Sequence, residues 1–137
     1  MTRLAVSVLV TVQNDPRRIL LVRRSPKLKF LGGYLAFPGG VLDEEDQAIP
    51  VSGLPADGQA PGAFIVAAAR ELFEETGLWK PRGLPIVSER LRHYRHDVLG
   101  EELTFSDILS RETQTVHAAD FEPICRITTP PYSARQR

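Results

Sequence analysis

Residues 70–78 read Arg-Glu-Leu-Phe-Glu-Glu-Thr-Gly-Leu, and they form the end of the clearest helical pattern in the sequence. Apolar residues recur at helical spacing and a glycine stands at the expected stop, so we predict a helix over residues 63–76. Residues three and four apart lie on one face of a helix, which places Glu71, Glu74 and Glu75 on one patch. Three carboxylates this close repel one another, and a bound divalent cation relieves that cost.

The ordinary explanation for a run of charged residues is a solvated helix face. In this segment, however, no lysine stands four residues from a glutamate to offset its charge, and a pattern this specific seldom arises by chance. Arg70 can pair with a neighbouring carboxylate through its planar guanidinium and hold it in place. We therefore interpret the patch as a candidate site for Mg²⁺, which prefers oxygen ligands.

The residues before this helix predict short strands joined by polar turns. Residues 4–13 are rich in valine and suit a strand, residues 14–16 are a turn signal, and residues 19–22 form a second apolar run. A hairpin is the simplest arrangement of these two strands. Residues 25–33 form a basic loop, and residues 34–37 form a brief strand that stops at a Pro-Gly-Gly sequence.

Outside these strands and the helix, the sequence gives weaker signals. Repeated prolines and glycines predict that residues 47–62 are an irregular surface loop. The segment from residue 86 onward is ambiguous until Ser106, which can cap a short helix through Leu109. Residues 124–128 favour a late strand, which two prolines end.

The composition fits one globular domain spanning residues 1–137. Hydrophobic residues make up 42% and charged residues 25% of the chain, close to globular averages, and the formal net charge is zero. Generic nucleic-acid and anionic-membrane binders need a basic excess, so we expect neither partner. No apolar run reaches the roughly 20 residues of a membrane-spanning helix. Cys125 is the single cysteine; we expect it to be a buried small hydrophobe, and the protein to be cytoplasmic.

The acidic motif resembles the Nudix box. The pattern of that family is Gly, five residues, Glu, seven residues, then Arg-Glu-U-x-Glu-Glu-x-Gly-U, where U is a bulky aliphatic residue. Residues 70–78 match the helical half of this pattern in full. Residues 37–40, Phe-Pro-Gly-Gly, are similar to the sequence that leads into the box.

The first half of the box departs from the family pattern. Five residues separate Gly40 from Asp46, which stands where the family has Glu, and residues 47–69 separate Asp46 from Arg70, where the family has seven residues. The loop at 47–62 accounts for the excess, and such an insertion is tolerated because loop length enters the free energy only logarithmically. The counterpart of the family's glutamate is therefore open, and the candidates are Asp46, Glu44 and Glu45, or none.

The resemblance implies an α/β fold, the Nudix-type α/β/α sandwich with a mixed sheet. It also implies hydrolysis of a nucleoside diphosphate linked to another moiety, with Mg²⁺ or Mn²⁺ as the cofactor. Glu74 and Glu75 would be metal ligands, and Glu71 would be a further ligand or the base that activates water. Arg70 would orient Glu71, and the Gly39 backbone carbonyl would complete the coordination. The implied catalytic set is thus Arg70, Glu71 and Glu74.

A second resemblance concerns the substrate. Residues 20–40 are similar to the extra motif of the coenzyme A diphosphatase branch, with Val22 in place of Thr and Lys29 in place of Arg, and the interrupted box is similar to the peroxisomal type. Coenzyme A and acyl-CoA carry a 3′-phosphate besides the diphosphate, so basic residues at the entrance would help to bind them. We expect substrate contacts from Arg23, Arg24, Lys29 and Gly40. ADP-ribose, NADH and other nucleotides remain open as substrates, as does a Nudix-fold binding module without turnover.

Other polar residues carry no comparable signal. His93 and His96 stand three residues apart with no third ligand nearby in the sequence, so a surface or packing role is favoured over a metal pair. Trp79 and Tyr94 are expected to pack in the core rather than stack on a base. Residues 127–133 are similar to the start of another strand in the coenzyme A type, so the chain is either a compact variant or a fragment that is incomplete at its C-terminus. An unpaired sheet edge would favour a homodimer.

Overall fold

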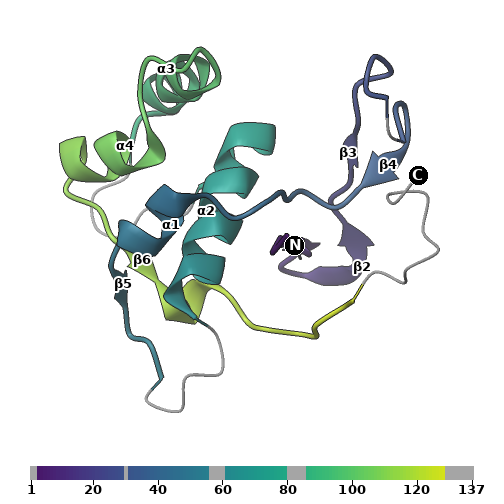
Figure 1. The fold of residues 1–137 in the computed structure, drawn as a ribbon, viewed down its shortest axis with the longest axis horizontal. Coiled ribbons are helices and arrows are strands. Elements are labelled where there is room, and N and C mark those ends of the chain that lie inside the picture. The colour runs from purple at the N-terminus through teal and green to yellow at the C-terminus, as the bar shows by residue number, and fades with distance from the viewer. Residues whose placement is uncertain (1–2, 30, 56–60, 80–85, 129–137) are drawn as a thin grey trace.

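The computed structural model describes residues 3–29, 31–55, 61–79 and 86–128, and it has a mixed α/β architecture (Figure 1). Within these ranges the strands form three two-stranded sheets, two of which pair antiparallel and one parallel. In the same ranges, no helix is both long and apolar enough to cross a membrane.

The N-terminal part contains the predicted antiparallel hairpin, but the bounds of its strands differ from the prediction. Of residues 4–13 only Thr11–Val12 form a strand, and the run expected over residues 19–22 is divided between the ends of two strands. β1 (Thr11–Val12) pairs with β2 (Asp15–Ile19), and β3 (Val22–Arg23) pairs with β4 (Leu35–Ala36). The turn between the first two strands occupies residues 13–14. The turn predicted over 14–16 is therefore displaced, because the last two of its residues already belong to β2.

The first segment of the chain also lies against the Pro-Gly-Gly sequence. The amide of Val6 donates a hydrogen bond to the carbonyl of Gly40 at 2.9 Å, and the amide of Val8 donates to the carbonyl of Pro38 at 2.7 Å. These hydrogen bonds hold the Gly39–Gly40 pair against residues 6–8.

Helix α2 (Gly62–Thr76) is the predicted helix and the centre of the fold. It ends as expected, because Gly77 adopts a left-handed conformation (φ 74°) and its amide donates to the carbonyl of Phe73 at 2.7 Å. In Figure 1, α2 lies between the N-terminal strands on one side and the parallel pair of β5 (Val51–Ser52) and β6 (Val116–His117) on the other.

One hydrophobic core forms where α2 meets the C-terminal elements. Phe73 is fully buried, and its ring lies 6.1 Å from that of Phe105 and 5.9 Å from that of Trp79, measured between centroids. Trp79 and Tyr94 are partly buried and pack against this core, as expected. The buried members of the core are Ile65, Val66, Ala69, Phe73, Phe105, Ile108, Leu109, Val116 and Ala118.

The ambiguous segment after residue 86 forms two helices and a short turn. α3 spans Ser88–Leu99, α4 spans Phe105–Arg111, and a single 3₁₀ turn (η1) spans Ala118–Asp120. The predicted cap of α4 at Ser106 is wrong, because Thr104 caps the helix two residues earlier. Its hydroxyl accepts the amide of Asp107 at 3.2 Å, and the Asp107 carboxylate accepts the Thr104 amide at 2.9 Å.

The prediction of an irregular loop over residues 47–62 is wrong for its first part. A short helix, α1 (Glu44–Ala48), runs into this segment. It is followed by β5, where Val51 pairs with Val116 of β6. Ile49 and Val51 also pack against the core, so apolar side chains and backbone pairing outweigh the surrounding prolines and glycines. Residues 56–60 lie outside the described ranges.

The strand predicted at residues 124–128 is absent from the described part of the chain. Ile124 is 72% exposed and Ile127 is 85% exposed, and no described segment pairs with their backbone. A strand propensity expresses itself only where another strand offers an edge, which explains the difference. Cys125 is exposed as well, so the expectation that it is buried is wrong.

Candidate functional site

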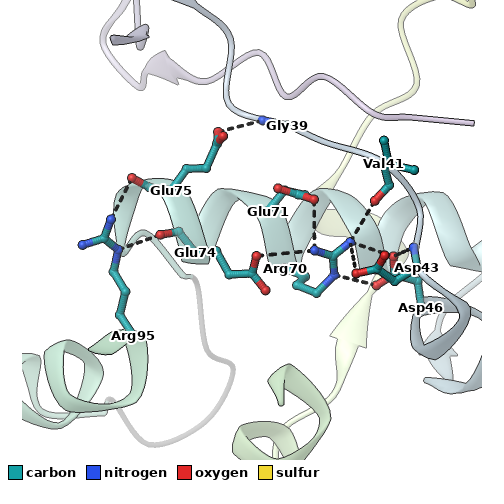
Figure 2. A network of polar contacts seen from close by, with 9 residues as sticks. All are labelled: Gly39, Val41, Asp43, Asp46, Arg70, Glu71, Glu74, Glu75 and Arg95. Atoms are coloured by element: carbon teal, nitrogen blue, oxygen red, sulfur yellow. Dashed lines mark hydrogen bonds and ion pairs between the residues drawn. The ribbon is translucent and has the colours of Figure 1, made fainter. Parts of the chain in front are cut away.

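Arg70 is buried in the middle of α2 and holds several acidic groups together (Figure 2). Its Nε and Nη2 donate to the two carboxylate oxygens of Asp46, both at 2.9 Å, and Nη2 also donates to the carbonyl of Val41 at 3.1 Å. Asp46 is 0% exposed and Arg70 is 8% exposed. A buried ion pair of this kind is stable only when its geometry is good and its remaining donors are satisfied, and both conditions hold here.

Asp46 also ties this pair to the start of α1. Its Oδ2 accepts the backbone amide of Asp43 at 2.8 Å, so the same carboxylate holds the helix N-terminus and Arg70. Glu44 and Glu45, the other candidates for this position, are exposed. The acid that meets Arg70 across the inserted segment is therefore Asp46, a partner that the sequence left open.

The third nitrogen of Arg70 contacts two carboxylates of α2. Nη1 lies 3.0 Å from Glu71 Oε1 and 3.4 Å from Glu74 Oε2. We refer to Asp46, Arg70, Glu71, Glu74 and the Val41 carbonyl as the Arg70 network. Burial disfavours the charged guanidinium, but the hydrogen bond and charge of Asp46, with the charges of the two glutamates, outweigh it and raise the pKa of Arg70.

The carboxylates of Glu71 and Glu74 are costly to keep ionised. Burial raises the pKa of both above the usual value; Arg70 opposes this, and nearby carboxylates add to it. For Glu71 these neighbours are Glu75 and Asp43, and for Glu74 they include Glu71. Burial is therefore the main cost of keeping these two carboxylates ionised, and the charge of Arg70 offsets only part of it.

The glycine pair packs directly against this row. The amide of Gly39 donates to Glu75 Oε2 at 2.9 Å, so it is the amide of Gly39 that meets the glutamates. A Cβ added at Gly40 would overlap the carboxylate of Glu71. A Cβ added at Gly39, whose φ is +151°, would overlap the carbonyl of Val6. Only glycine lets the backbone pass between residues 6–7 and the glutamates.

Glu71, Glu74 and Glu75 all line a cavity of about 420 Å³. Arg23 and Arg24 of the β3–β4 hairpin line it too, as does Arg95 of α3. The Nε of Arg24 is buried and has no hydrogen-bond partner among the described residues. One cavity is thus lined by three glutamates and three arginines. Its remaining lining residues are Val22, Ser25, Leu28, Ala36, Phe37 and Leu99.

The structure brings together most of the predicted site residues. Lys29 is the exception, because it is exposed and is not among the residues that line the cavity. Arg95 was missed: its Nε donates to the carbonyl of Glu74 at 2.8 Å and its Nη2 to that of Glu75 at 3.0 Å. No sequence signal marks such a contact, because backbone carbonyls are present at every residue.

The donor set on α2 has the chemistry that a hard divalent cation requires. Carboxylate oxygens are the ligands that Mg²⁺ and Mn²⁺ prefer, and a bound cation would offset the cost of burying Glu71 and Glu74 in their charged form. Among the described residues, no three acidic, histidine or cysteine side chains converge on one point as they stand. Each glutamate is instead engaged with Arg70 or Gly39, and binding an ion would exchange these contacts.

The histidines lie apart from this cavity. His93 Nδ1 lies 3.0 Å from the carbonyl of Glu89, and His96 Nδ1 lies 3.5 Å from the carboxylate of Asp97. Both side chains are exposed on α3. These contacts support the surface role that was favoured over a metal pair.

Comparisons with known proteins agree with one another. The model of the NUDIX domain family matches residues 1–125. The chain is 34% identical over 76 residues to the Caenorhabditis elegans protein that carries the name nudix hydrolase 7, an alignment that covers 56% of this chain and 22% of that protein. The crystal structure of a NUDIX hydrolase from Alicyclobacillus acidocaldarius superposes with a TM-score of 0.67 at 27% identity, over 96% of this chain and 64% of that one. The chain thus spans less than two-thirds of the length of either relative.

Proposed function

This chain belongs to the NUDIX domain family and has its mixed α/β fold, and from this premise we propose that it hydrolyses the diphosphate linkage of a nucleoside diphosphate derivative. The observation that carries the proposal is that three glutamates and three arginines line one and the same cavity. The acidic wall suits a divalent cation, and the basic wall suits phosphate oxygens. A diphosphate that binds between these walls would be neutralised from both sides.

We assign the cation to the glutamates of α2. Glu71, Glu74 and Glu75 would hold Mg²⁺ or Mn²⁺, with the backbone of Gly39 beside them. The ion would neutralise the phosphate oxygens and lower the pKa of a bound water. Glu71 would serve either as a ligand or as the base that takes the proton from the attacking water. Burial raises its pKa, and a carboxylate with a raised pKa accepts a proton more readily.

Arg70 acts through its neighbours rather than on the substrate. It is buried, and all three of its nitrogens are engaged by Asp46, Val41 and the glutamates. Its task is to fix the orientation of Glu71 and Glu74, and Asp46 fixes Arg70 in turn. We therefore regard Arg70, expected from the sequence to be catalytic, as a positioning residue.

Within this class we propose coenzyme A or acyl-CoA as the substrate. The supporting features are Arg23 and Arg24 on the cavity wall, with the Arg24 Nε lacking any partner among the described residues. A 3′-phosphate beyond the diphosphate would pair with these two guanidinium groups, and it would reach the buried Arg24 Nε only if that side chain shifted on binding. Apolar residues of the same cavity, including Leu28 and Phe37, suit the less polar part of such a molecule.

The test is a product analysis with Mn²⁺ or Mg²⁺ present. The protein is incubated separately with coenzyme A, ADP-ribose and NADH, and the products are identified by mass spectrometry. We expect coenzyme A to yield a 3′,5′-adenosine bisphosphate and a phosphopantetheine fragment. Cleavage of ADP-ribose or NADH alone would keep the diphosphatase assignment and remove the coenzyme A assignment.

Inactivity needs a second measurement to be interpreted. If no compound of a broad nucleotide panel is cleaved, thermal stabilisation by the same compounds distinguishes two outcomes. Stabilisation without product would identify a binding module that has lost turnover, and the absence of both would overturn the proposed function.

A further inference from the structure

The C-terminal end of α2 is held by a side chain from another helix. The last carbonyls of a helix have no partner within it, and they are satisfied by caps, by water or by other groups. At this end the carbonyl of Phe73 accepts the Gly77 amide, and that of Leu72 accepts the Thr76 hydroxyl. The next two carbonyls, those of Glu74 and Glu75, accept the guanidinium of Arg95 at 2.8 and 3.0 Å.

Arg95 is itself held in place by the packing of α3. Leu91, Tyr94 and Val98 of this helix pack against the core. The Tyr94 hydroxyl donates to Glu112 at the end of α4, at 2.6 Å. The aliphatic part of Arg95 lies over Gly77, where an added Cβ would come within 3.3 Å of the Arg95 Cδ. The fork of Arg95 is thus anchored before any ligand binds.

The two residues that Arg95 holds by their backbone are two of the three that bear the carboxylates of the cavity. Their side chains are fixed separately, because Glu74 contacts Arg70 and Glu75 accepts the Gly39 amide. Figure 2 shows Arg95 at one end of this row and Arg70 toward the other. Fraying of the last turn of α2 would move both carboxylates at once, and Arg95 opposes that movement.

We propose that Arg95 is a positioning residue for the cation site: by binding the backbone of Glu74 and Glu75, it keeps their carboxylates aligned for a divalent ion. This inference rests on the proposed function, because it assumes that these glutamates bind the ion. It assigns a role to α3, which contributes no residue to the acidic motif.

The direction of the change in divalent-ion affinity on removing Arg95 distinguishes a positioning role from a purely electrostatic one. Arg95 lines the cavity as a cation, so through its charge alone it would repel a divalent ion, and its removal would tighten binding. Through positioning, its removal weakens binding. Loss of a residue that orients metal ligands typically costs about 10- to 100-fold in metal affinity.

The experiment measures Mn²⁺ affinity by isothermal titration calorimetry for three variants. Arg95→Met removes the guanidinium and keeps an apolar stem over Gly77, and Arg95→Lys restores the charge without the planar fork. Arg92→Met is the matched control, because Arg92 is exposed one turn away on the same helix. We expect Mn²⁺ to bind about tenfold more weakly to Arg95→Met, with partial recovery in Arg95→Lys and none of this change in Arg92→Met.

A second readout uses the metal-free protein. Hydrogen exchange of the Gly77 amide reports the last turn of α2, and we expect it to quicken in Arg95→Met and not in Arg92→Met. Unchanged or tighter Mn²⁺ binding by Arg95→Met would overturn the positioning role while the proposed function stands. Failure of the wild-type protein to bind Mn²⁺ would overturn the proposed function, and this inference with it.

Discussion

Two regions meet at the glutamates of α2, and they differ in how their arginines are partnered. In the Arg70 network, every nitrogen of the buried guanidinium has an acceptor, chiefly the carboxylate of Asp46. In the cavity, the Nε of Arg24 is buried and has no acceptor among the described residues. The comparison separates two uses of the same side chain: a satisfied arginine builds the site, whereas an arginine with a buried, unpaired donor gains from any rearrangement or ligand that supplies an acceptor.

The first prediction concerns Glu74, which belongs to both regions. It contacts Arg70 and also lines the cavity, so Glu74→Gln removes the charge of a proposed metal ligand with little change in shape. We expect turnover to fall by about 100-fold or more, with little loss of stability. Steady-state kinetics of the purified variant, beside its thermal unfolding, measures both quantities.

The control for this variant is Glu89→Gln, an exposed glutamate in the first turn of α3. It changes the net charge by the same amount but lies outside the cavity. Near-native turnover by Glu74→Gln would remove its carboxylate from the mechanism, and an equal loss in both variants would point to a general effect of charge.

The second prediction tests the Arg70 network, in which every guanidinium nitrogen has an acceptor. Asp46→Asn removes the charge that faces a buried guanidinium, and breaking one half of a buried ion pair typically costs about 3–5 kcal/mol in the free energy of unfolding. Urea denaturation measures this loss. Glu45→Gln, an exposed acid of the same short helix, should change stability by less than about 1 kcal/mol. If the two variants were equally stable, Asp46 would not hold the network together.

The sequence predicted the parts of this site that depend on local pattern. α2 follows from the spacing of its apolar residues and from the glycine at its end, and both signals lie within one short stretch of sequence. The three glutamates on that helix follow from the same periodicity. The α/β fold class and the NUDIX family followed from the motif these residues form, and the family match and the fold agree with it.

The parts that the sequence did not predict depend on contacts between distant segments. Asp46 meets Arg70 across an inserted segment, so its spacing from the motif carries no information about the contact. α3 is mostly polar and charged, and only Leu91, Tyr94 and Val98 pack against the core, so its apolar stripe is too narrow to identify the helix clearly. The strand expected at 124–128 also depends on a distant contact. These residues suit a strand, but no edge of a described sheet pairs with them.

The third prediction tests the cavity, which Arg24 lines. Arg24→Met removes a guanidinium whose Nε has no protein partner among the described residues, so its removal should leave stability unchanged or slightly raised. Under the coenzyme A proposal, the KM for coenzyme A should rise about tenfold, because a charge-assisted hydrogen bond is lost. Dephospho-coenzyme A, which lacks the 3′-phosphate, should be affected less.

This variant sharpens the contrast with Asp46→Asn. The first should change substrate binding without stability, and the second should change stability foremost. A marked loss of stability in Arg24→Met would mean that this arginine is structural, and an equal change in KM for both substrates would place the 3′-phosphate elsewhere.

The smallest effect is expected from a change of pH. It acts on Glu71 and Glu74, which belong to the Arg70 network and also line the cavity. The pKa values of Glu71 and Glu74 are raised in the folded protein, mainly by burial, so the metal-free folded state takes up protons more readily than the unfolded chain. Their contribution to stability therefore increases as the pH falls through these raised values toward the usual one. A divalent ion competes with those protons, so its stabilising effect should decrease over the same range.

The measurement is the rise in Tm on adding Mn²⁺, taken at about pH 7.5 and about pH 5. We expect the rise to be smaller at the lower pH by roughly 2–4 °C, and Glu71→Gln to reduce this pH dependence because one of the two titrating groups is gone. The Arg24→Met variant should keep the dependence of the wild type, since Arg24 belongs to the basic wall. If Mn²⁺ stabilised the wild-type protein equally at both pH values, the ion would bind away from these glutamates. The Arg70 network would then not orient the ligands of a metal ion in the cavity.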